Sequence, residues 1–193
     1  MRKSSKASTG TTDRATDIVD VLAEEHAALR TLAGPVGASD DDGTAYLAWS
    51  DRVIRHEIAE ELVVYPVLLR YDGGMAVVDS RLDDQSDIER QLVALGREVA
   101  GTARFRMGAA RLVLGHLSHL EREDSQVLPI LASRVGRRRR VDLGRRFRQV
   151  QQVAPLHQLP EGIRIPTGRT VVDRTSALSV WLRDVAVSSG LAS

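Results

Sequence analysis

One 14-residue segment of this chain occurs twice. Residues 56–69 read HEIAEELVVYPVLL, and residues 119–132 read HLEREDSQVLPILA. Residues four apart on an α-helix lie on the same face, one turn apart. The repeat therefore predicts two helices in the same phase, each presenting one His and one Glu from a single face. The shared positions are His56 and His119, Glu60 and Glu123, Glu61 and Asp124, Pro66 and Pro129, and Leu68 and Leu131.

The rest of the chain also favours helix, because Leu, Ala, Val, Arg and Glu dominate and only 4% of residues are aromatic. Apolar residues recur at helical spacing in four segments, at about 12–33, 43–70, 76–100 and 103–135. In the third segment the apolar stripe includes Leu82, Ile88 and Val99. Four long amphipathic helices with short loops predict an all-α fold, an up-down-up-down four-helix bundle.

The two prolines of the repeat lie late in the second and fourth predicted helices. Proline lacks the backbone N–H and crowds the carbonyl four residues earlier, so Pro66 and Pro129 should each kink or loosen the last turns.

Composition narrows the class of protein further. The 193 residues include no cysteine, which excludes disulfides and thiolate metal sites. No apolar stretch is long enough to span a membrane, and the polar start of the chain lacks the apolar core of a signal peptide. We therefore expect a cytoplasmic protein with no membrane partner.

Three regions follow from these patterns. Residues 1–12 are expected to form a disordered arm, residues 13–135 the helix bundle, and residues 136–193 a basic, partly helical extension. Residues 134–193 hold 12 Lys and Arg against 4 Asp and Glu, although the whole chain carries only +1. An acidic body with a basic tail predicts either docking of the tail on the body or a polyanionic partner.

Both His–Glu pairs fall on apolar stripes, and so does His26 on the first helix. A single such histidine is usually a core residue, and a single His–Glu pair can be a salt bridge. Two pairs in a repeated frame favour a metal site, because buried carboxylates are costly unless they are paired or bind a cation. Imidazole and carboxylate ligands suit iron, manganese or zinc. The candidate ligands are His26, His56, Glu60, His119 and Glu123.

These motifs resemble the hemerythrin family, specifically its HHE cation-binding domain. Residues 24–32, EEHAALRTL, are similar to the first-helix motif of that family, and the two repeat segments are similar to the second- and fourth-helix motifs. The resemblance covers about residues 17–133. It implies a non-haem di-iron centre with bridging Glu60 and Glu123 and with terminal His26, His56 and His119.

The third helix departs from the family pattern. Members often carry a His there, whereas this chain has Gln85. Gln85 can bind weakly, a neighbour such as His116, Glu57 or Glu89 can replace it, or one metal position can be open. One iron, or another divalent metal, is therefore an alternative to two irons.

The resemblance implies binding or sensing of oxygen or another small diatomic ligand. The alternatives are an enzyme acting on peroxide or nitric oxide, and a regulatory module that uses its basic tail on an acidic partner. No general-base motif is visible, which leaves enzyme status open. The tail has no recognisable DNA-binding motif, and its arginines could equally hold it against the acidic bundle, so we do not expect nucleic acid as a partner.

Overall fold

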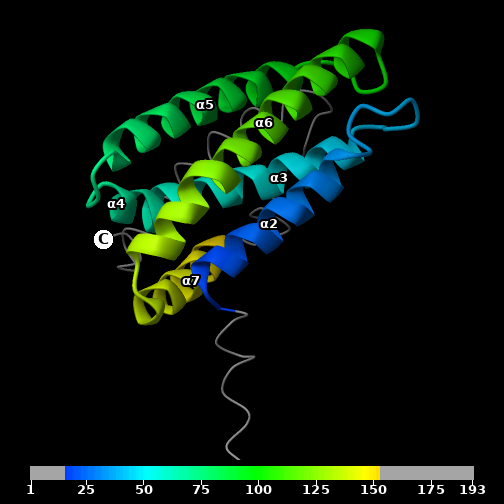
Figure 1. Ribbon diagram of the computed structural model, residues 1–193. Coiled ribbons are helices and arrows are strands. Elements are labelled where there is room, and N and C mark those ends of the chain that lie inside the picture. The colour runs from blue at the N-terminus through cyan, green and yellow to red at the C-terminus, as the bar shows by residue number, and fades with distance from the viewer. Residues whose placement is uncertain (1–15, 153–193) are drawn as a thin grey trace, which may run out of the picture.

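The computed structural model describes residues 16–152, and every regular element within that range is a helix (Figure 1). The elements are α2 (Ile18–Ala33), α3 (Thr44–Ala59), the π-helix η1 (Glu60–Val64), α4 (Tyr65–Leu68), α5 (Gly74–Leu95), α6 (Ala103–Arg134) and α7 (Arg137–Gln152).

The elements α2, α3, α5 and α6 pack around one core, with η1 and α4 continuing α3. The predicted all-α bundle is confirmed. The expected N-terminal arm and residues 153–193 lie outside the described range. None of the described helices is both long and apolar enough to cross a membrane.

Short polar side chains set where the helices begin. Asp17 accepts a hydrogen bond from the backbone N–H of Val19 and so caps α2. Thr102 does the same for Phe105 at the start of α6. These caps satisfy N–H groups that lack a partner in the first turn of a helix.

The predicted apolar stripes form the core, with two exceptions in the third segment. Leu82 is 37% exposed and Val99 is 70% exposed. Arg81 takes the inward position instead, because it continues the helical spacing of Val78 and Gln85, whereas Leu82 is rotated about 100° toward solvent. Val99 lies beyond the end of α5 at Leu95.

The second predicted helix is interrupted just before Pro66. Pro66 has no N–H, and its ring crowds the carbonyl of Leu62, so the preceding turn widens into η1. The N–H of Tyr65 then bonds to the carbonyl of Glu60, five residues earlier. The other proline leaves its helix continuous, since α6 runs past Pro129 to Arg134. The expected loosening therefore occurs in only one copy of the repeat.

Helix α7 packs across α2, α3 and η1, at the end of the bundle where α2 begins and α6 ends (Figure 1). Its buried face includes Phe147, which is fully inaccessible to solvent. Gly144 lies so close to the start of α2 that an added Cβ would be 1.9 Å from the carbonyl oxygen of Thr16. The basic segment therefore forms a helix that is seated directly on the bundle.

Ion pairs accompany this packing. Arg140 Nε lies 2.9 Å from Asp17 Oδ2, and Arg148 Nη2 lies 2.8 Å from Glu24 Oε2. Docking of basic residues on the acidic body, one of the two alternatives left open by the sequence, is therefore present in α7.

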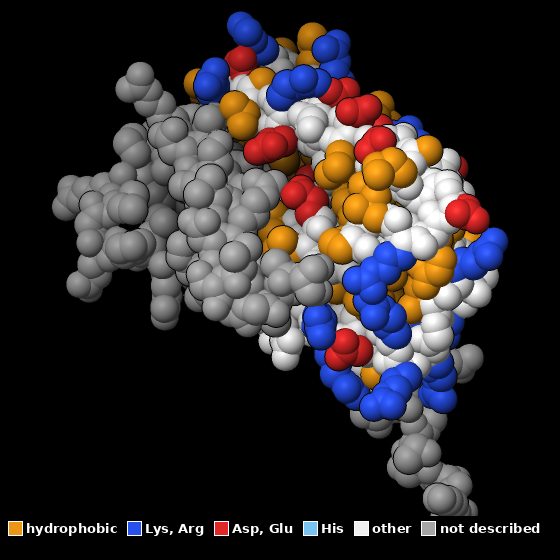
Figure 2. All heavy atoms as spheres, turned by 90° about the vertical axis from the view of Figure 1, so that its left-hand side faces the viewer, with side chains coloured by type: hydrophobic (Ala, Val, Ile, Leu, Met, Phe, Trp, Pro, Cys, Tyr) orange, Lys and Arg blue, Asp and Glu red, His pale blue; other side chains and the backbone are white. Residues whose placement is uncertain are grey.

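The face that carries α4 and α7 shows an apolar patch with arginines around it (Figure 2). A groove of about 50 Å³ between these elements is lined by Leu62, Pro66 and Leu143, with Arg70 and Arg139 among its polar residues.

Candidate metal centre

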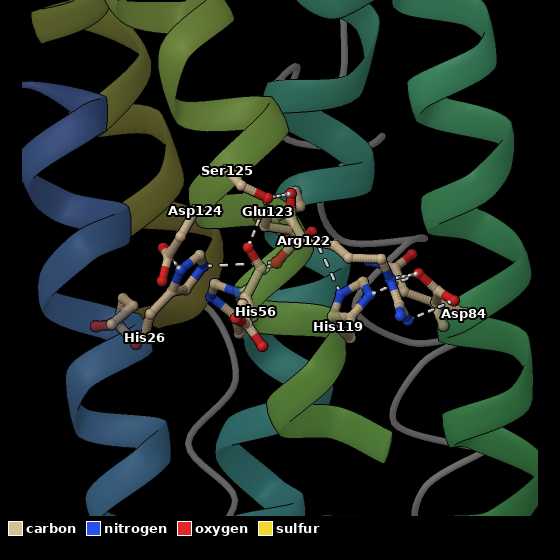
Figure 3. Close-up of polar contacts among 12 residues, drawn as sticks. His26, His56, Asp84, His119, Arg122, Glu123, Asp124 and Ser125 are labelled. Carbon is tan, nitrogen blue, oxygen red and sulfur yellow. Dashed lines mark hydrogen bonds and ion pairs between the residues drawn. The ribbon is translucent and has the colours of Figure 1, made fainter. Parts of the chain in front are cut away.

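The five predicted ligands come from four elements and meet inside the bundle. α2 supplies His26, α3 supplies His56, η1 supplies Glu60, and α6 supplies both His119 and Glu123. All five side chains are fully buried. Figure 3 shows the three imidazoles arranged around Glu123, which comes from a different turn of α6 from His119.

Glu123 lies at the centre of this group. Its Oε2 is 3.5 Å from His26 Nε2 and 3.9 Å from His56 Nε2, whereas its Oε1 is 3.3 Å from His119 Nε2. Each carboxylate oxygen of Glu123 therefore faces a different set of imidazoles. Glu60 Oε2 lies on the side of His26 and His56, 3.6 Å from His56 Nε2.

The donor atoms fit a cation. One atom from each of His26, His56, Glu60 and Glu123 lies within 4.8 Å of the others. Among residues 16–152, the Nε2 atoms of His26, His56 and His119 have no hydrogen-bond partner. Buried polar atoms normally have a partner, so converging imidazole and carboxylate donors of this kind are suited to a metal ion. That all five bind a metal stays a prediction.

Two aspartates lie beside the Nδ1 atoms of two of the histidines (Figure 3). Asp124 Oδ1 is 2.6 Å from His26 Nδ1, and Asp124 also accepts a hydrogen bond from Arg30. Burial would raise the pKa of Asp124, but its hydrogen bonds with His26 and Arg30 lower it below its usual value. A carboxylate at Nδ1 favours the proton there and leaves Nε2 free to bind a metal.

The second aspartate is Asp84 on α5, whose Oδ2 lies 3.5 Å from His119 Nδ1. Arg122 holds Asp84 through two contacts, of 2.8 and 3.1 Å, and Arg81 Nη2 lies 3.1 Å from its Oδ2. Asp124 is one of the positions shared by the two repeat segments, whereas the sequence analysis did not single out Asp84.

Gln85, the departure from the family pattern, is buried and bonded to a tyrosine. Its Nε2 donates to the Tyr65 hydroxyl at 2.7 Å. That hydroxyl is 3.2 Å from Glu123 Oε1 and 3.5 Å from Glu60 Oε2. The position opposite the two His–Glu pairs is therefore occupied by a Gln–Tyr pair.

Sequence reasoning missed Tyr65, because five residues after Glu60 is the wrong face of a regular α-helix. In η1 the hydrogen bond joins residues five apart, and Tyr65 comes to lie beside Glu60. The signal that could have found it was Pro66, which forces the wider turn.

None of the three proposed substitutes for a third-helix histidine is among the four residues whose donor atoms lie within 4.8 Å of one another. Glu89 is exposed, so it does not reach the interior. His116 is buried, but its ring packs against Trp49 at 5.2 Å. Glu57 is 7% exposed, and burial together with the charge of Glu123 raises its pKa well above the usual value.

Burial also sets the protonation of the central residues. It raises the pKa of Glu60 well above its usual range, and the nearby charge of Glu123 raises it further. Burial alone would raise the pKa of Glu123 too, but His119 and His56 outweigh this and lower it. Burial lowers the pKa of His56, which therefore stays neutral and can act as a ligand.

Comparison with known proteins gives the same assignment. The model of the hemerythrin HHE cation-binding domain matches residues 17–131. This chain belongs to the hemerythrin HHE cation-binding domain family. The resemblance noted in the sequence is thereby confirmed. The matched region of this hemerythrin-like protein ends before α7, so α7 is additional to the family domain.

One curated relative is an uncharacterized hemerythrin-like protein of Schizosaccharomyces pombe. It is 22% identical over 176 residues, covering 88% of this chain and 86% of the relative. No solved structure matches the chain.

Proposed function

We propose that this protein holds a non-haem di-iron centre that binds or senses oxygen or a related small ligand. The observation that carries the proposal is the position of Glu123, whose two oxygens face different imidazoles at 3.3 to 3.9 Å. A carboxylate placed in this way is suited to bridge two metal ions, as in other helix bundles with di-iron sites.

Two metal positions would have unequal ligands. His26, His56 and Glu60 would hold one iron, whereas His119 and the other oxygen of Glu123 would hold the second. Two irons held by these residues would supply reversible one-electron redox chemistry. The Gln85–Tyr65 pair replaces an imidazole at the second position and leaves it with fewer strong donors.

The surroundings favour a small ligand over a large substrate. All five ligand side chains are fully buried within a core of aliphatic and aromatic residues, which admits a small uncharged molecule and excludes bulky or strongly hydrated ones. Asp124, whose Oδ1 is 2.6 Å from His26 Nδ1, favours the proton on that outer nitrogen and thereby leaves Nε2 available to a metal.

One observation favours a second candidate, an enzyme that processes peroxide. The Tyr65 hydroxyl lies within 3.5 Å of both central carboxylates, and burial raises its pKa well above its usual value, so it keeps its proton. A buried O–H donor beside the centre can supply a hydrogen bond that a simple oxygen carrier does not need. Peroxide consumption by the iron-loaded protein would distinguish this candidate.

The third alternative, a basic tail for an acidic partner, gains no such support. Two arginines of α7, Arg140 and Arg148, pair with Asp17, which caps α2, and with Glu24 of α2. We therefore do not extend the proposal to nucleic acid.

The decisive experiment is anaerobic loading with ferrous iron, followed by metal counting and absorption spectroscopy in air. Two irons per chain with bands of an oxygen-bridged pair support the di-iron proposal, and one iron supports a single-metal site. Glu123→Gln should lose the iron. Glu121→Gln, on the exposed face of the same helix, is the matched control and should keep it. A wild-type protein that retains no iron overturns the proposal.

A further inference from the structure

The helix α7 brings one aromatic ring into contact with a candidate ligand. Phe147 is fully buried, and its ring centroid lies 5.7 Å from that of His56, with the two ring planes inclined by 72°. The match to the family domain ends at residue 131, so this contact comes from a helix outside the matched region. α7 therefore adds a neighbour to the centre that the family domain does not supply.

His56 differs from the other two candidate imidazoles in what lies at its Nδ1 atom. Asp124 Oδ1 lies 2.6 Å from Nδ1 of His26, and Asp84 Oδ2 lies 3.5 Å from Nδ1 of His119. For Nδ1 of His56, the described part of the chain offers no hydrogen-bond partner. A histidine that binds a metal usually donates its second N–H to a carboxylate, a carbonyl or water, and this bond fixes the orientation of the ring. His56 lacks such a bond to the described residues.

Ring packing can provide the orientation instead. The torsion that turns a histidine ring has only a broad preference, so an imidazole without a hydrogen bond depends on its neighbours. Two rings contact His56, that of His26 at 5.0 Å and 77° and that of Phe147 at 5.7 Å and 72°. Because edge-to-face packing is favourable only over a limited range of angles, a rotated His56 would lose both contacts. His26 is itself a candidate ligand, which leaves Phe147 as the support from outside the ligand set.

Contacts on both sides of Phe147 fix its place. Gly144, three residues earlier, lies so close to the start of α2 that an added Cβ would be 1.9 Å from a carbonyl oxygen there. Four residues after Phe147, the carbonyl of Gln151 accepts a hydrogen bond of 2.7 Å from Arg55, which directly precedes His56 on α3. α7 is therefore held against α2 at one point and beside His56 at another.

We propose that α7 completes the metal centre, with Phe147 as a positioning residue that holds the His56 imidazole so that its Nε2 faces Glu60 and Glu123. This inference rests on the proposed function, because it needs a metal bound at His56, but it is the same for one iron or two. Its consequence is that iron affinity depends on a helix that lies outside the family domain.

A second phenylalanine provides a matched control. Phe105 is 2% exposed, and its ring lies 5.7 Å from that of Tyr46 in the same edge-to-face arrangement, but Tyr46 is not a candidate ligand. Phe147→Leu and Phe105→Leu each remove one buried aromatic ring and keep an apolar side chain. Circular dichroism shows whether each variant is folded. Competition with a chelator of known affinity then measures the binding of ferrous iron.

Phe147→Leu should weaken iron binding about tenfold, as expected when the support of a metal-binding histidine is removed. Phe105→Leu should keep the wild-type affinity. Phe147→Met, which also removes the ring but has a flexible side chain that fills irregular gaps, takes the place of Phe147→Leu if that variant does not fold. Equal losses of affinity at positions 147 and 105, or no loss at position 147, overturn the inference.

The iron-free protein gives a direct readout of ring orientation. In nuclear magnetic resonance spectra of protein with isotope-labelled histidine, Phe147→Leu should shift and broaden the ring signals of His56, because the imidazole loses a neighbouring ring and turns more freely. Phe105→Leu should leave these signals unchanged. Wild-type signals of His56 in Phe147→Leu would overturn the inference. Since this measurement needs no metal, it separates failure of the positioning role from failure of the proposed function, which a wild-type protein without iron would show.

Discussion

The hydroxyl of Tyr65 lies 3.2 Å from Glu123 Oε1, and Gln85 Nε2 donates to the same hydroxyl at 2.7 Å. Tyr65 therefore connects Gln85, which stands where the family often has a histidine, to Glu123 at the middle of the candidate metal centre. It does so only because η1 turns it toward Glu60.

The first prediction concerns this link. Tyr65→Phe should lower the free energy of unfolding of the iron-free protein by about 1–3 kcal/mol, because the buried Gln85 amide loses its acceptor. Urea denaturation measures the change. Tyr71→Phe is a matched control, since its hydroxyl bonds to the Arg134 carbonyl in a more exposed place and should contribute less. Equal losses in both variants would contradict a special role for Tyr65.

The second prediction concerns Gln85 itself. Gln85→His should raise the affinity for ferrous iron about tenfold, because imidazole is a better iron ligand than a neutral amide. Competition with a chelator of known affinity measures it. An unchanged affinity would show that Gln85 does not stand at a ligand position.

The third prediction concerns the orientation of His26. Asp124→Asn should lower iron affinity about tenfold or more, because the carboxylate that holds the Nδ1 proton of His26 loses its charge. Chelator competition again measures the change. Glu121→Gln, an exposed acid on the same helix, removes the same charge from the surface and should have no effect. If both variants keep wild-type affinity, Asp124 is not part of the centre.

The fourth prediction concerns the seating of α7. The Phe147 ring is fully buried and lies 5.7 Å from the ring of His56. Phe147→Ala should therefore cost about 3–5 kcal/mol of stability by leaving a cavity. Arg145→Ala, on the exposed side of α7, should change stability by no more than about 0.5 kcal/mol. A small effect of Phe147→Ala would mean that α7 is not seated on the bundle in solution.

The sequence could bring the five candidate ligands together because the information that marks them is local. Helical spacing alone places His56 and Glu60 on one face, and the repeat at residues 119–132 marks His119 and Glu123 in the same way. His26 could be included because it falls on an apolar stripe and because the first-helix motif resembles that of the family.

The residues that were missed depend on contacts between elements. Asp84 reaches His119 from a neighbouring helix, and no spacing rule along α5 reports that contact. Phe147 meets His56 only because α7 folds back over α2 and α3. Leu82 was misplaced for a related reason. The aliphatic Leu82 was placed in the apolar stripe, but Arg81 is the buried residue, and Asp84 gives its guanidinium an ion pair.

The last prediction is a pH dependence of the iron-free protein. Burial lowers the pKa of His56 and of His116 below the ordinary value of 6.5. When the folded pKa of a histidine is depressed, the unfolded chain takes up the proton first, so stability falls as the pH drops below about 6.5. His119, His26 and Glu123 also face this region, and of these Glu123 partly opposes the effect on His116.

In urea unfolding at pH 7.5, 6.5 and 5.5, each of these histidines should lower the free energy of unfolding by up to about 1.4 kcal/mol for each pH unit. Glu57 and Glu60, whose pKa values are raised, act in the opposite direction. The lowered pKa of Asp124 does not contribute in this window, because its ordinary value is 3.8. His116→Leu should make the free energy of unfolding fall less as the pH drops, because it removes one of the two histidines while Glu57 and Glu60 stay in place. A pH dependence unchanged by His116→Leu would show that His116 does not stay neutral in the folded protein.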